Sequence, residues 1–231
     1  QTARLIKDFA DNGFVNIDNV KMSKSLGNFF TLREVLPRLR HPEVMRAFLL
    51  ASHYRGPINY ATVQLEQADA ALTRLYTALR GVAPGAAGDP KVTAASVADA
   101  RFTAVLDDDF NTPEAFAVLQ DLARELNSAR AAGEASLASG LAAELRRLGG
   151  VLGVLQVDPE VWFRLQAGDF AAPGAAAAQL DEAQIEAQIA ARLAARRARE
   201  FAAADRIRDE LAAAGVQLED QSGGRTIWRR E

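Results

Sequence analysis

Two lysines, Lys21 and Lys24, lie three residues apart in a short polar segment that carries the most specific chemistry in the chain. Residues 21–28 read Lys-Met-Ser-Lys-Ser-Leu-Gly-Asn. Ammonium and hydroxyl groups on such a loop can grip a polyphosphate, because they offer charge and hydrogen-bond donors to phosphate oxygens. A lysine- and serine-rich run of unspecified order would more simply be a solvated turn. The order of the residues separates these two interpretations.

The octapeptide resembles the ATP-binding signature of class I aminoacyl-tRNA synthetases, and residues 29–36, Phe-Phe-Thr-Leu-Arg-Glu-Val-Leu, resemble its cysteinyl-tRNA synthetase version. The resemblance implies that Lys24 stabilises the charge that builds on the phosphate oxygens of ATP, used with Mg²⁺, while Lys21 supports the closed loop. An ammonium placed in advance favours such a transition state. The serines are expected to donate hydrogen bonds and to cap the following helix. The implied ATP-binding residues are Lys21, Met22, Ser23, Lys24 and Ser25.

Other parts of such an active site have no counterpart in this sequence. Class I synthetases pair the lysine loop with an upstream His-x-Gly-His signature, whereas His41 and His53 both lie downstream of the loop. Cysteinyl enzymes also hold zinc through cysteines with His and Glu, and this chain has no cysteine. Because the chain begins at Gln1, almost directly at the loop, we expect the C-terminal portion of a synthetase. We expect it to be inactive alone and to hold no metal, the zinc ligands lying elsewhere in the full enzyme.

Length and composition are typical of a mostly helical globular protein. With 231 residues, 49% of them hydrophobic, the chain can bury a substantial core. No apolar run reaches the roughly 18 residues of a membrane span, and no signal-peptide pattern is present. Zero cysteines exclude a disulfide framework. We therefore expect a cytoplasmic, monomeric protein with no membrane partner.

The formal net charge of −3 hides two basic ends around an acidic middle. Residues 1–59 carry nine Lys and Arg against five Asp and Glu, and residues 60–184 carry nine against seventeen. Residues 192–231 carry nine arginines against seven acids. Local positive patches hold polyanions, so this pattern suits phosphate contacts at both ends. Acidic helices that merely keep the protein in solution would give the same middle segment.

The first 60 residues predict a short strand, the lysine loop and two short helices. Apolar residues alternate with polar ones over residues 13–20, which indicates an extended segment. A helix is expected over residues 31–36, ended by Pro37, and another from Pro42 to Ser52. Residues 52–60 are expected to form a turn. In the family a similar stretch contacts the inner side of the tRNA, which implies that Arg55 touches a phosphate.

The middle of the chain predicts an antiparallel helical bundle, with a further helix over residues 94–106. Its apolar stripes are too short for sustained heptads, so they are expected to form a core. The stripes are Leu65, Leu72, Leu75, Tyr76 and Leu79; then Phe116, Leu119, Leu122 and Leu126; then Leu137, Leu141, Leu145, Leu148 and Leu152.

Three adjacent acids, residues 107–109, invite a metal-site interpretation. They lack the alternate spacing, the glycine and the terminal Glu of a calcium loop. We expect Thr112 to be an N-cap and Pro113 the first helical residue, with the acids around the positive end of that helix. Residues 107–115, Asp-Asp-Asp-Phe-Asn-Thr-Pro-Glu-Ala, are also a hallmark of the cysteinyl-type helical domain, where the resemblance implies a structural role.

The C-terminal residues predict a small α+β module after a Gly/Ala/Pro-rich linker. An apolar stripe begins at Ile185, and arginines cluster at residues 192–199. A second helix is expected to stop at Gly215, followed by a hairpin of residues 216–219 and 226–229 around Gly223-Gly224. From the residues alone, a solvated arginine face and an RNA-binding surface remain equal alternatives.

Cysteinyl-tRNA synthetases end in a module of this kind, which reads three anticodon bases as splayed single-stranded nucleotides. Arginine can pair with guanine or stack on a base, a carboxylate can accept from base N–H groups, and an aromatic ring can carry a stacked base. The resemblance places Arg196, Phe201, Asp205 and Asp220 at contact positions, with Trp228 close by. Phe201 stands where the family often has Trp, so the stacking role is kept and the indole hydrogen bond is lost.

The sequence therefore predicts a mainly α fold in four segments. They are the end of a catalytic domain with the KMSKS loop and a stem-contact region (1–60), a helical bundle (61–165), a linker (166–180) and an anticodon-binding module (181–231). The implied partners are ATP, cysteine and tRNA(Cys). Two alternatives are a cysteine ligase of mycothiol synthesis that acts on an amino sugar, and a non-catalytic RNA-binding protein with a decayed loop. The C-terminal module argues against the first, and the intact octapeptide argues against the second.

Overall fold

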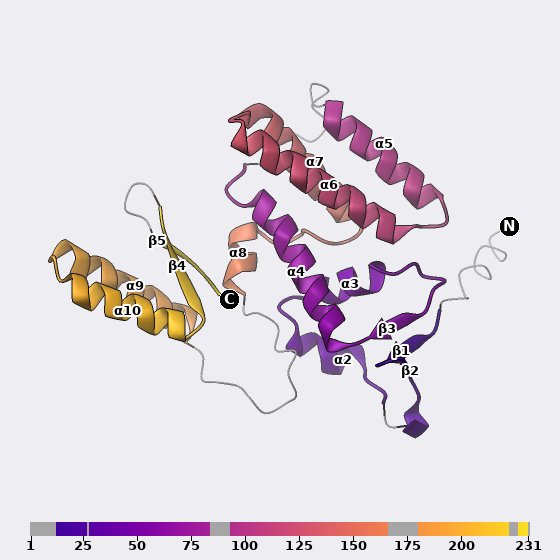
Figure 1. Ribbon diagram of the computed structural model, residues 1–231, viewed down its shortest axis with the longest axis horizontal. Helices are drawn as coiled ribbons and strands as arrows, with labels where there is room; N and C mark the ends of the chain where they lie inside the picture. The colour runs from indigo at the N-terminus through magenta and orange to yellow at the C-terminus, as the bar shows by residue number, and fades with distance from the viewer. Residues whose placement is uncertain (1–12, 27, 84–92, 166–179, 222–225, 231) are drawn as a thin grey trace. The chain divides into compact units, whose positions relative to one another are not determined.

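The computed structural model describes residues 13–26, 28–83, 93–165, 180–221 and 226–230, and is mostly helical (Figure 1). It has two compact units, Gln1–Trp162 with Gly168–Phe170, and Phe163–Ala167 with Ala171–Glu231. The helices are α2 (Leu32–Val35), α3 (Pro42–Leu50), α4 (Thr62–Leu79), α5 (Thr93–Asp107), α6 (Thr112–Ala131), α7 (Ala135–Val151), α8 (Pro159–Arg164), α9 (Glu182–Arg197) and α10 (Phe201–Ala213). The strands are β1 (Val15–Ile17), β2 (Val20–Lys21), β3 (Ile58–Tyr60), β4 (Val216–Asp220) and β5 (Thr226–Arg230).

This architecture confirms the predicted mainly α fold. The four-segment division stays a prediction, since the residues on both sides of position 60 belong to one compact unit. The expected linker, apart from Leu180, and the glycine pair at 223–224 lie outside the described residues. Within the described part of the chain, no helix is both long and apolar enough to cross a membrane.

The first unit begins with a small three-stranded sheet of order β2-β1-β3. β1 pairs antiparallel with β2 and parallel with β3. Asp18 and Asn19, both with positive φ, make the two-residue hairpin turn, which the right-handed twist of paired strands favours. Gly13 enters this sheet against Gly56, whose carbonyl oxygen would lie 1.8 Å from a Cβ at position 13. The predicted extended segment over residues 13–20 is confirmed only for β1, because Asp18 and Asn19 turn the chain back. Residues 52–60 are not all turn, because their last three residues form β3.

The two short helices after the loop are confirmed with different ends. α2 is N-capped by Thr31, whose side chain accepts from the Glu34 N–H in a capping box. Pro37 does not end the helical path, since a 3₁₀ turn over Leu36–Arg38 includes it. α3 starts at Pro42 as predicted and ends at Leu50, two residues before the expected end.

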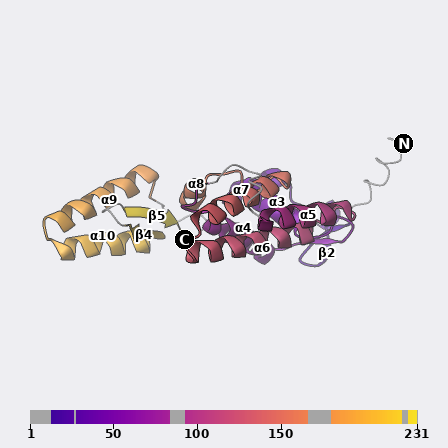
Figure 2. The same ribbon diagram turned by 90° about the horizontal axis from the view of Figure 1, so that it is seen from above.

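Helices α4 to α7 form the bundle, and both Figure 1 and Figure 2 show α6 and α7 side by side. The predicted stripe of α4 is buried throughout. On α6 the buried face runs through Ala115 and Val118, while Phe116 is only half-buried. The N-cap of α6 is Asn111 and not Thr112, because the Asn111 side chain accepts from the Glu114 N–H and the Thr112 hydroxyl donates to the Leu50 carbonyl.

Glu43, on the first turn of α3, is a buried carboxylate within this unit, with a relative exposure of 4%. One oxygen accepts from the Tyr76 hydroxyl at 2.8 Å and from the Leu155 N–H at 2.9 Å, and the other accepts from the Gln156 N–H at 2.9 Å. Tyr76 in turn stacks on the buried Trp162 ring, with centroids 4.2 Å apart. The carboxylate thus holds α3, α4 and the chain after α7 together.

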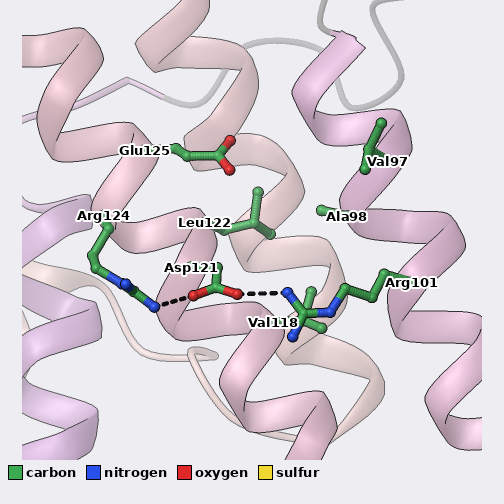
Figure 3. A pocket seen from close by; sticks show the side chains of 8 residues that line it. All are labelled: Val97, Ala98, Arg101, Val118, Asp121, Leu122, Arg124 and Glu125. Carbon is green, nitrogen blue, oxygen red and sulfur yellow. Dashed lines mark hydrogen bonds and ion pairs between the residues drawn. The ribbon is translucent and has the colours of Figure 1, made fainter.

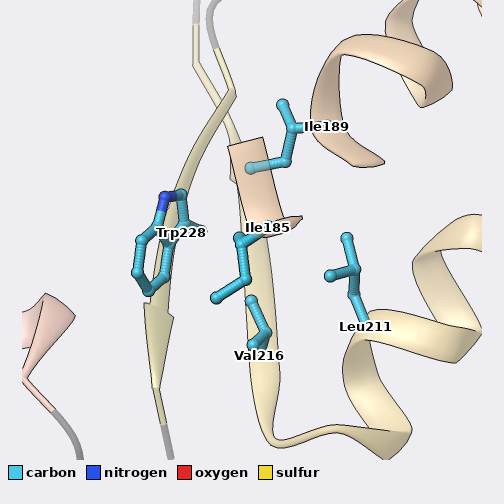
Figure 4. Packing of buried hydrophobic residues seen from close by; sticks show 5 residues of the cluster. All are labelled: Ile185, Ile189, Leu211, Val216 and Trp228. Carbon is cyan, nitrogen blue, oxygen red and sulfur yellow. The ribbon is translucent and has the colours of Figure 1, made fainter. Parts of the chain in front are cut away.

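The second unit packs two helices against a hairpin. Figure 2 shows β4 and β5 along the α9 and α10 pair, and the strands pair antiparallel as predicted. α10 ends before Gly215, whose φ of +74 degrees suits glycine. Residues from α9, α10, β4 and β5 form the core of the second unit (Figure 4). They are Ile185, Ile189, Leu211, Val216 and Trp228.

Candidate functional site

The octapeptide leaves the β1–β2 hairpin directly. β2 ends at Lys21, and the Met22 N–H still donates to the Val15 carbonyl at 3.1 Å, so the ladder extends one residue into the motif. Lys24 then begins a 3₁₀ turn, Lys24–Leu26, in which the Leu26 N–H donates to the Ser23 carbonyl. The second lysine therefore stands where an ordered strand gives way to a short helical turn.

The two serines support this turn locally. The Ser25 N–H donates to the Ser23 hydroxyl oxygen at 3.2 Å, and the two hydroxyl oxygens lie 2.6 Å apart. Ser23 thus acts as a cap for the 3₁₀ turn. The expectation that these serines cap the following helix is wrong for α2, since Thr31 occupies its N-cap position.

Lys21 is exposed and lies over an aromatic ring. Its Nζ is 4.0 Å from the centroid of Phe14, which is 66% exposed. A cation over a ring face is attracted by the ring quadrupole, although only modestly at an exposed site. Phe14, which the sequence reasoning did not single out, therefore helps to place the first lysine of the motif.

Asn28 is a further residue at this loop to which sequence reasoning gave no role. Its side-chain carbonyl accepts from the Ser23 N–H at 2.9 Å, and its amide nitrogen donates to the Lys21 carbonyl at 3.3 Å. An asparagine after a glycine is typical of any turn, so its type carried no signal for this role.

Arg55, expected to touch a tRNA phosphate, instead has a partner within the unit. Its Nε and Nη2 donate to the two Asp109 carboxylate oxygens at 2.6 and 2.9 Å, and the Tyr54 hydroxyl donates to the same carboxylate at 2.7 Å. Hydrogen bonds from Arg55 and then Tyr54 hold the pKa of Asp109 well below its usual range. The third acid of the run thus ties the 52–57 turn to the start of α6, and a phosphate contact by Arg55 stays a prediction.

The second unit brings Asp220, at the end of β4, against two arginines of α9. Arg192, almost fully buried, donates from both terminal nitrogens to both carboxylate oxygens at 2.9 Å. Arg196 donates to the same carboxylate at 2.8 Å, and the Thr226 hydroxyl donates at 2.7 Å. The hydrogen bonds from Arg192 and then Thr226 hold the pKa of Asp220 well below its usual range.

Asp220→Asn is expected to destabilise the second unit by about 1–2 kcal/mol at neutral pH. Charge-assisted bonds to a buried guanidinium are lost, and solvent screening at the half-exposed carboxylate keeps the effect modest. Because the folded pKa is depressed, this stability is present above the unfolded pKa of roughly 3.9 and is lost as the pH falls through the folded value. Urea unfolding at several pH values, followed by Trp228 fluorescence in a Trp162→Phe background, measures it. An equal loss at pH 7 and at pH 2 would contradict this assignment.

The remaining predicted contacts divide between surface and core. Phe201 is 62% exposed at the start of α10, and Asp205 is exposed one turn later. Arg199, in the α9–α10 turn, has a φ of +64 degrees, a conformation that non-glycine residues rarely adopt. Trp228 is only 4% exposed and its indole N–H donates to Glu186 at 2.8 Å, so it is a core residue without an exposed face for a base.

A groove between α5 and α6 contains none of the functional-site residues that the sequence predicts. It holds about 400 Å³ and, as Figure 3 shows, Asp121 lies between Arg101 and Arg124 in it. The Arg101 guanidinium also pairs with Glu114 at 2.9 Å, so both arginines of the groove are held by carboxylates.

The zinc site implied by the resemblance does not fit these residues. No three His, Asp or Glu side chains in the described part of the chain group as metal ligands would, and the sequence has no cysteine.

Three family models match the chain in sequence order. They describe the tRNA synthetases class I (C) catalytic domain at residues 1–70, the DALR domain at residues 101–156, and the cysteinyl-tRNA ligase anticodon binding domain at residues 179–229. The cysteine–tRNA ligase of Methylococcus capsulatus is 54% identical over 223 residues, which are 95% of this chain and 45% of the relative. The chain belongs to the cysteine–tRNA ligase family.

Other cysteine–tRNA ligases match at the same level. The protein of Thioalkalivibrio sulfidiphilus is 57% identical over 95% of this chain and 44% of its own length, and that of Halorhodospira halophila is 53% identical over 98% and 46%. The chain thus spans less than half the length of these relatives. The solved LeuRS–tRNA–LeuAMS complex of Agrobacterium radiobacter K84 matches with a TM-score of 0.46 and 19% identity over 69% of this chain and 24% of that chain, a likeness too weak to assign function.

Proposed function

We propose that this chain acts as part of a cysteine–tRNA ligase, which activates cysteine with ATP and transfers it to tRNA(Cys). The observation that carries the proposal is the match to a catalytic-domain end, a DALR domain and an anticodon-binding domain in one chain, in that order. The intact octapeptide, whose first residue ends the β1–β2 hairpin, supports it. The cytoplasmic location and monomeric state expected of the enzyme belong to the same proposal.

In the proposed reaction the cysteine carboxylate attacks the α-phosphorus of ATP, and pyrophosphate leaves. Charge builds on the phosphate oxygens, and a lysine ammonium at the loop stabilises it more in the transition state than in the ground state. We assign this role to Lys24, the support of the closed loop to Lys21, and ATP contacts to Met22, Ser23 and Ser25. Mg²⁺ would accompany the ATP. The chain by itself is expected to give no ATP–pyrophosphate exchange.

For tRNA, we propose that the second unit reads the anticodon with Arg196, Phe201, Asp205 and Asp220. Arg196 and Asp220 have side-chain exposures of 47% and 43% despite their mutual contact, so a base edge can reach both. Trp228 has no part in this set, because its side chain is buried in the core between β5 and the helices. Arg55 could touch a phosphate only beside or in place of its contact with Asp109.

A binding titration over a range of salt concentrations tests the proposal. Fluorescently labelled tRNA(Cys) and the same tRNA with an exchanged anticodon are each titrated with the chain. We expect tighter binding of tRNA(Cys), and the salt slope counts the phosphates contacted. Equal affinity for the two tRNAs would defeat the anticodon assignment.

Phe201→Ala is expected to weaken tRNA(Cys) binding by about 1–3 kcal/mol, the value of one base stacked on an aromatic ring. Phe201→Trp keeps a stacking platform and is expected to retain the affinity. Arg208→Ala, an exposed change on the same helix, is the control for general electrostatics and should weaken both tRNAs alike. An alanine variant that binds like the parent chain would remove Phe201 from the contact set.

Neither alternative function is supported by the comparisons. The amino-sugar ligase lacks an anticodon domain, and residues 179–229 match one. The alternative of a non-catalytic RNA-binding protein assumes a decayed loop, whereas residues 1–70 match a catalytic domain and keep the octapeptide intact.

A further inference from the structure

The Asn28 side chain bridges two backbone groups on either side of Met22. Its carbonyl oxygen is 2.9 Å from the Ser23 nitrogen, and its amide nitrogen is 3.3 Å from the Lys21 oxygen. The orientation of the amide is fixed by chemistry, because a backbone N–H can only donate and a backbone carbonyl can only accept. The Asn28 amide therefore bonds the Ser23 N–H and the Lys21 carbonyl, which a further strand beside β2 would otherwise have bonded.

Ser23 is consequently anchored through each of its polar groups. Its N–H donates to Asn28, its carbonyl accepts from the Leu26 N–H, and its hydroxyl oxygen accepts from the Ser25 N–H. The next residue is Lys24, so the hydrogen bonds that fix the Ser23 backbone also fix the position of the Lys24 backbone nitrogen. Of these anchors, the one from Asn28 alone joins the turn back to the strand, through Lys21.

We propose that Asn28 is a positioning residue of the ATP loop, which holds the Met22–Ser23 backbone so that Lys24 is presented to the transferring phosphate. This inference rests on the proposed function of the loop. Asn28 acts through the backbone and contacts no reacting atom. Its neutral amide suits the site, since a carboxylate would repel both the Lys21 carbonyl and a polyphosphate.

The first test measures the hydrogen bond in this chain, independently of activity. Amide hydrogen exchange at Ser23, followed by NMR, is compared between the parent chain, Asn28→Ala and Asn28→Asp. We expect faster exchange by about tenfold in Asn28→Ala, the value of one ordinary hydrogen bond. Asn28→Asp keeps an acceptor for the Ser23 N–H and should stay protected. Unchanged exchange in Asn28→Ala would overturn the proposal.

The second test measures ATP–pyrophosphate exchange in the complete ligase. Asn28→Ala is expected to lower kcat by about tenfold or more, the joint value of two hydrogen bonds, with the KM for cysteine and the thermal unfolding midpoint unchanged. Asn127→Ala, an exposed asparagine change on α6, is the matched control. A lower midpoint with unaltered kcat per active site would show a merely structural role and overturn the proposal. If the parent ligase shows no exchange, the proposed function fails, and the NMR test still decides whether Asn28 holds the loop.

Discussion

Replacing Lys24 by alanine in the complete ligase is expected to slow adenylate formation at least about a hundredfold, close to 3 kcal/mol of activation free energy. The loss should fall on kcat for ATP–pyrophosphate exchange more than on the KM for ATP, because the ammonium meets its full charge partner only as pyrophosphate leaves. Lys24 follows Ser23, whose N–H, carbonyl and hydroxyl groups all have hydrogen-bond partners within the loop. Steady-state exchange kinetics with saturating cysteine give the measurement.

Arg33→Ala is the matched control for loss of a positive charge, since Arg33 is exposed on α2 outside the octapeptide. Its exchange rate should stay within about twofold of the parent ligase, because a screened surface charge contributes little. A loss below tenfold in Lys24→Ala would remove Lys24 from the catalytic role. A large loss of exchange rate in Arg33→Ala would instead indicate that the overall positive charge of residues 1–59 matters, and not Lys24 in particular.

Replacing Glu43 by alanine is expected to cost the first unit about 3 kcal/mol or more of unfolding free energy. The change leaves the Tyr76 hydroxyl and the Leu155 and Gln156 N–H groups without their acceptor. The first two donors are buried, and each unsatisfied buried donor costs about 1–3 kcal/mol, whereas the Gln156 N–H is only partly buried. Burial already raises the pKa of the Tyr76 phenol far above its usual range, so this hydroxyl cannot escape by ionising. Urea unfolding followed by Trp162 fluorescence in a Trp228→Phe background measures the loss.

Two further variants sharpen this prediction. Glu66→Ala, an exposed glutamate change on α4, should alter the unfolding free energy by less than about 0.5 kcal/mol. Glu43→Gln keeps acceptors for two of the three donors and turns an amide toward the third, so its loss should lie between those of the other two variants. Equal stability of Glu43→Ala and Glu66→Ala would show that the carboxylate does not hold this junction.

The helices could be predicted because their signals are local. The stripe from Leu65 to Leu79 repeats at the spacing of one helix face, and burial of that face follows from its apolar character. Turn chemistry was less decisive, as the start of α6 shows. Asn111, Thr112 and Pro113 all favour a helix start, and only the distant Leu50 carbonyl, which occupies the Thr112 hydroxyl, leaves the capping role to Asn111.

The polar sites were harder to predict because their partners are far apart in the sequence. Glu43 resembles an ordinary acid in a first helical turn, yet its partners include amides more than 110 residues later. Arg55 resembles an exposed phosphate ligand, yet its Nε and Nη2 donate to the Asp109 carboxylate. Trp228 resembles a stacking platform, yet α9 and α10 enclose it. Burial and pairing of this kind depend on which elements meet, which local spacing does not encode.

By itself, the sequence determined the family and the candidate functional residues. The order of residues in the octapeptide and the three domain matches depend on residue identity alone. Only the tertiary structure decided the exposure and the partners of the candidate side chains that it describes. It separated exposed Phe201 from buried Trp228, and it joined Asn28 to the backbone on both sides of Met22. The physical reason is that a side chain's chemistry depends on its exposure and its partners, and both are set when distant segments pack.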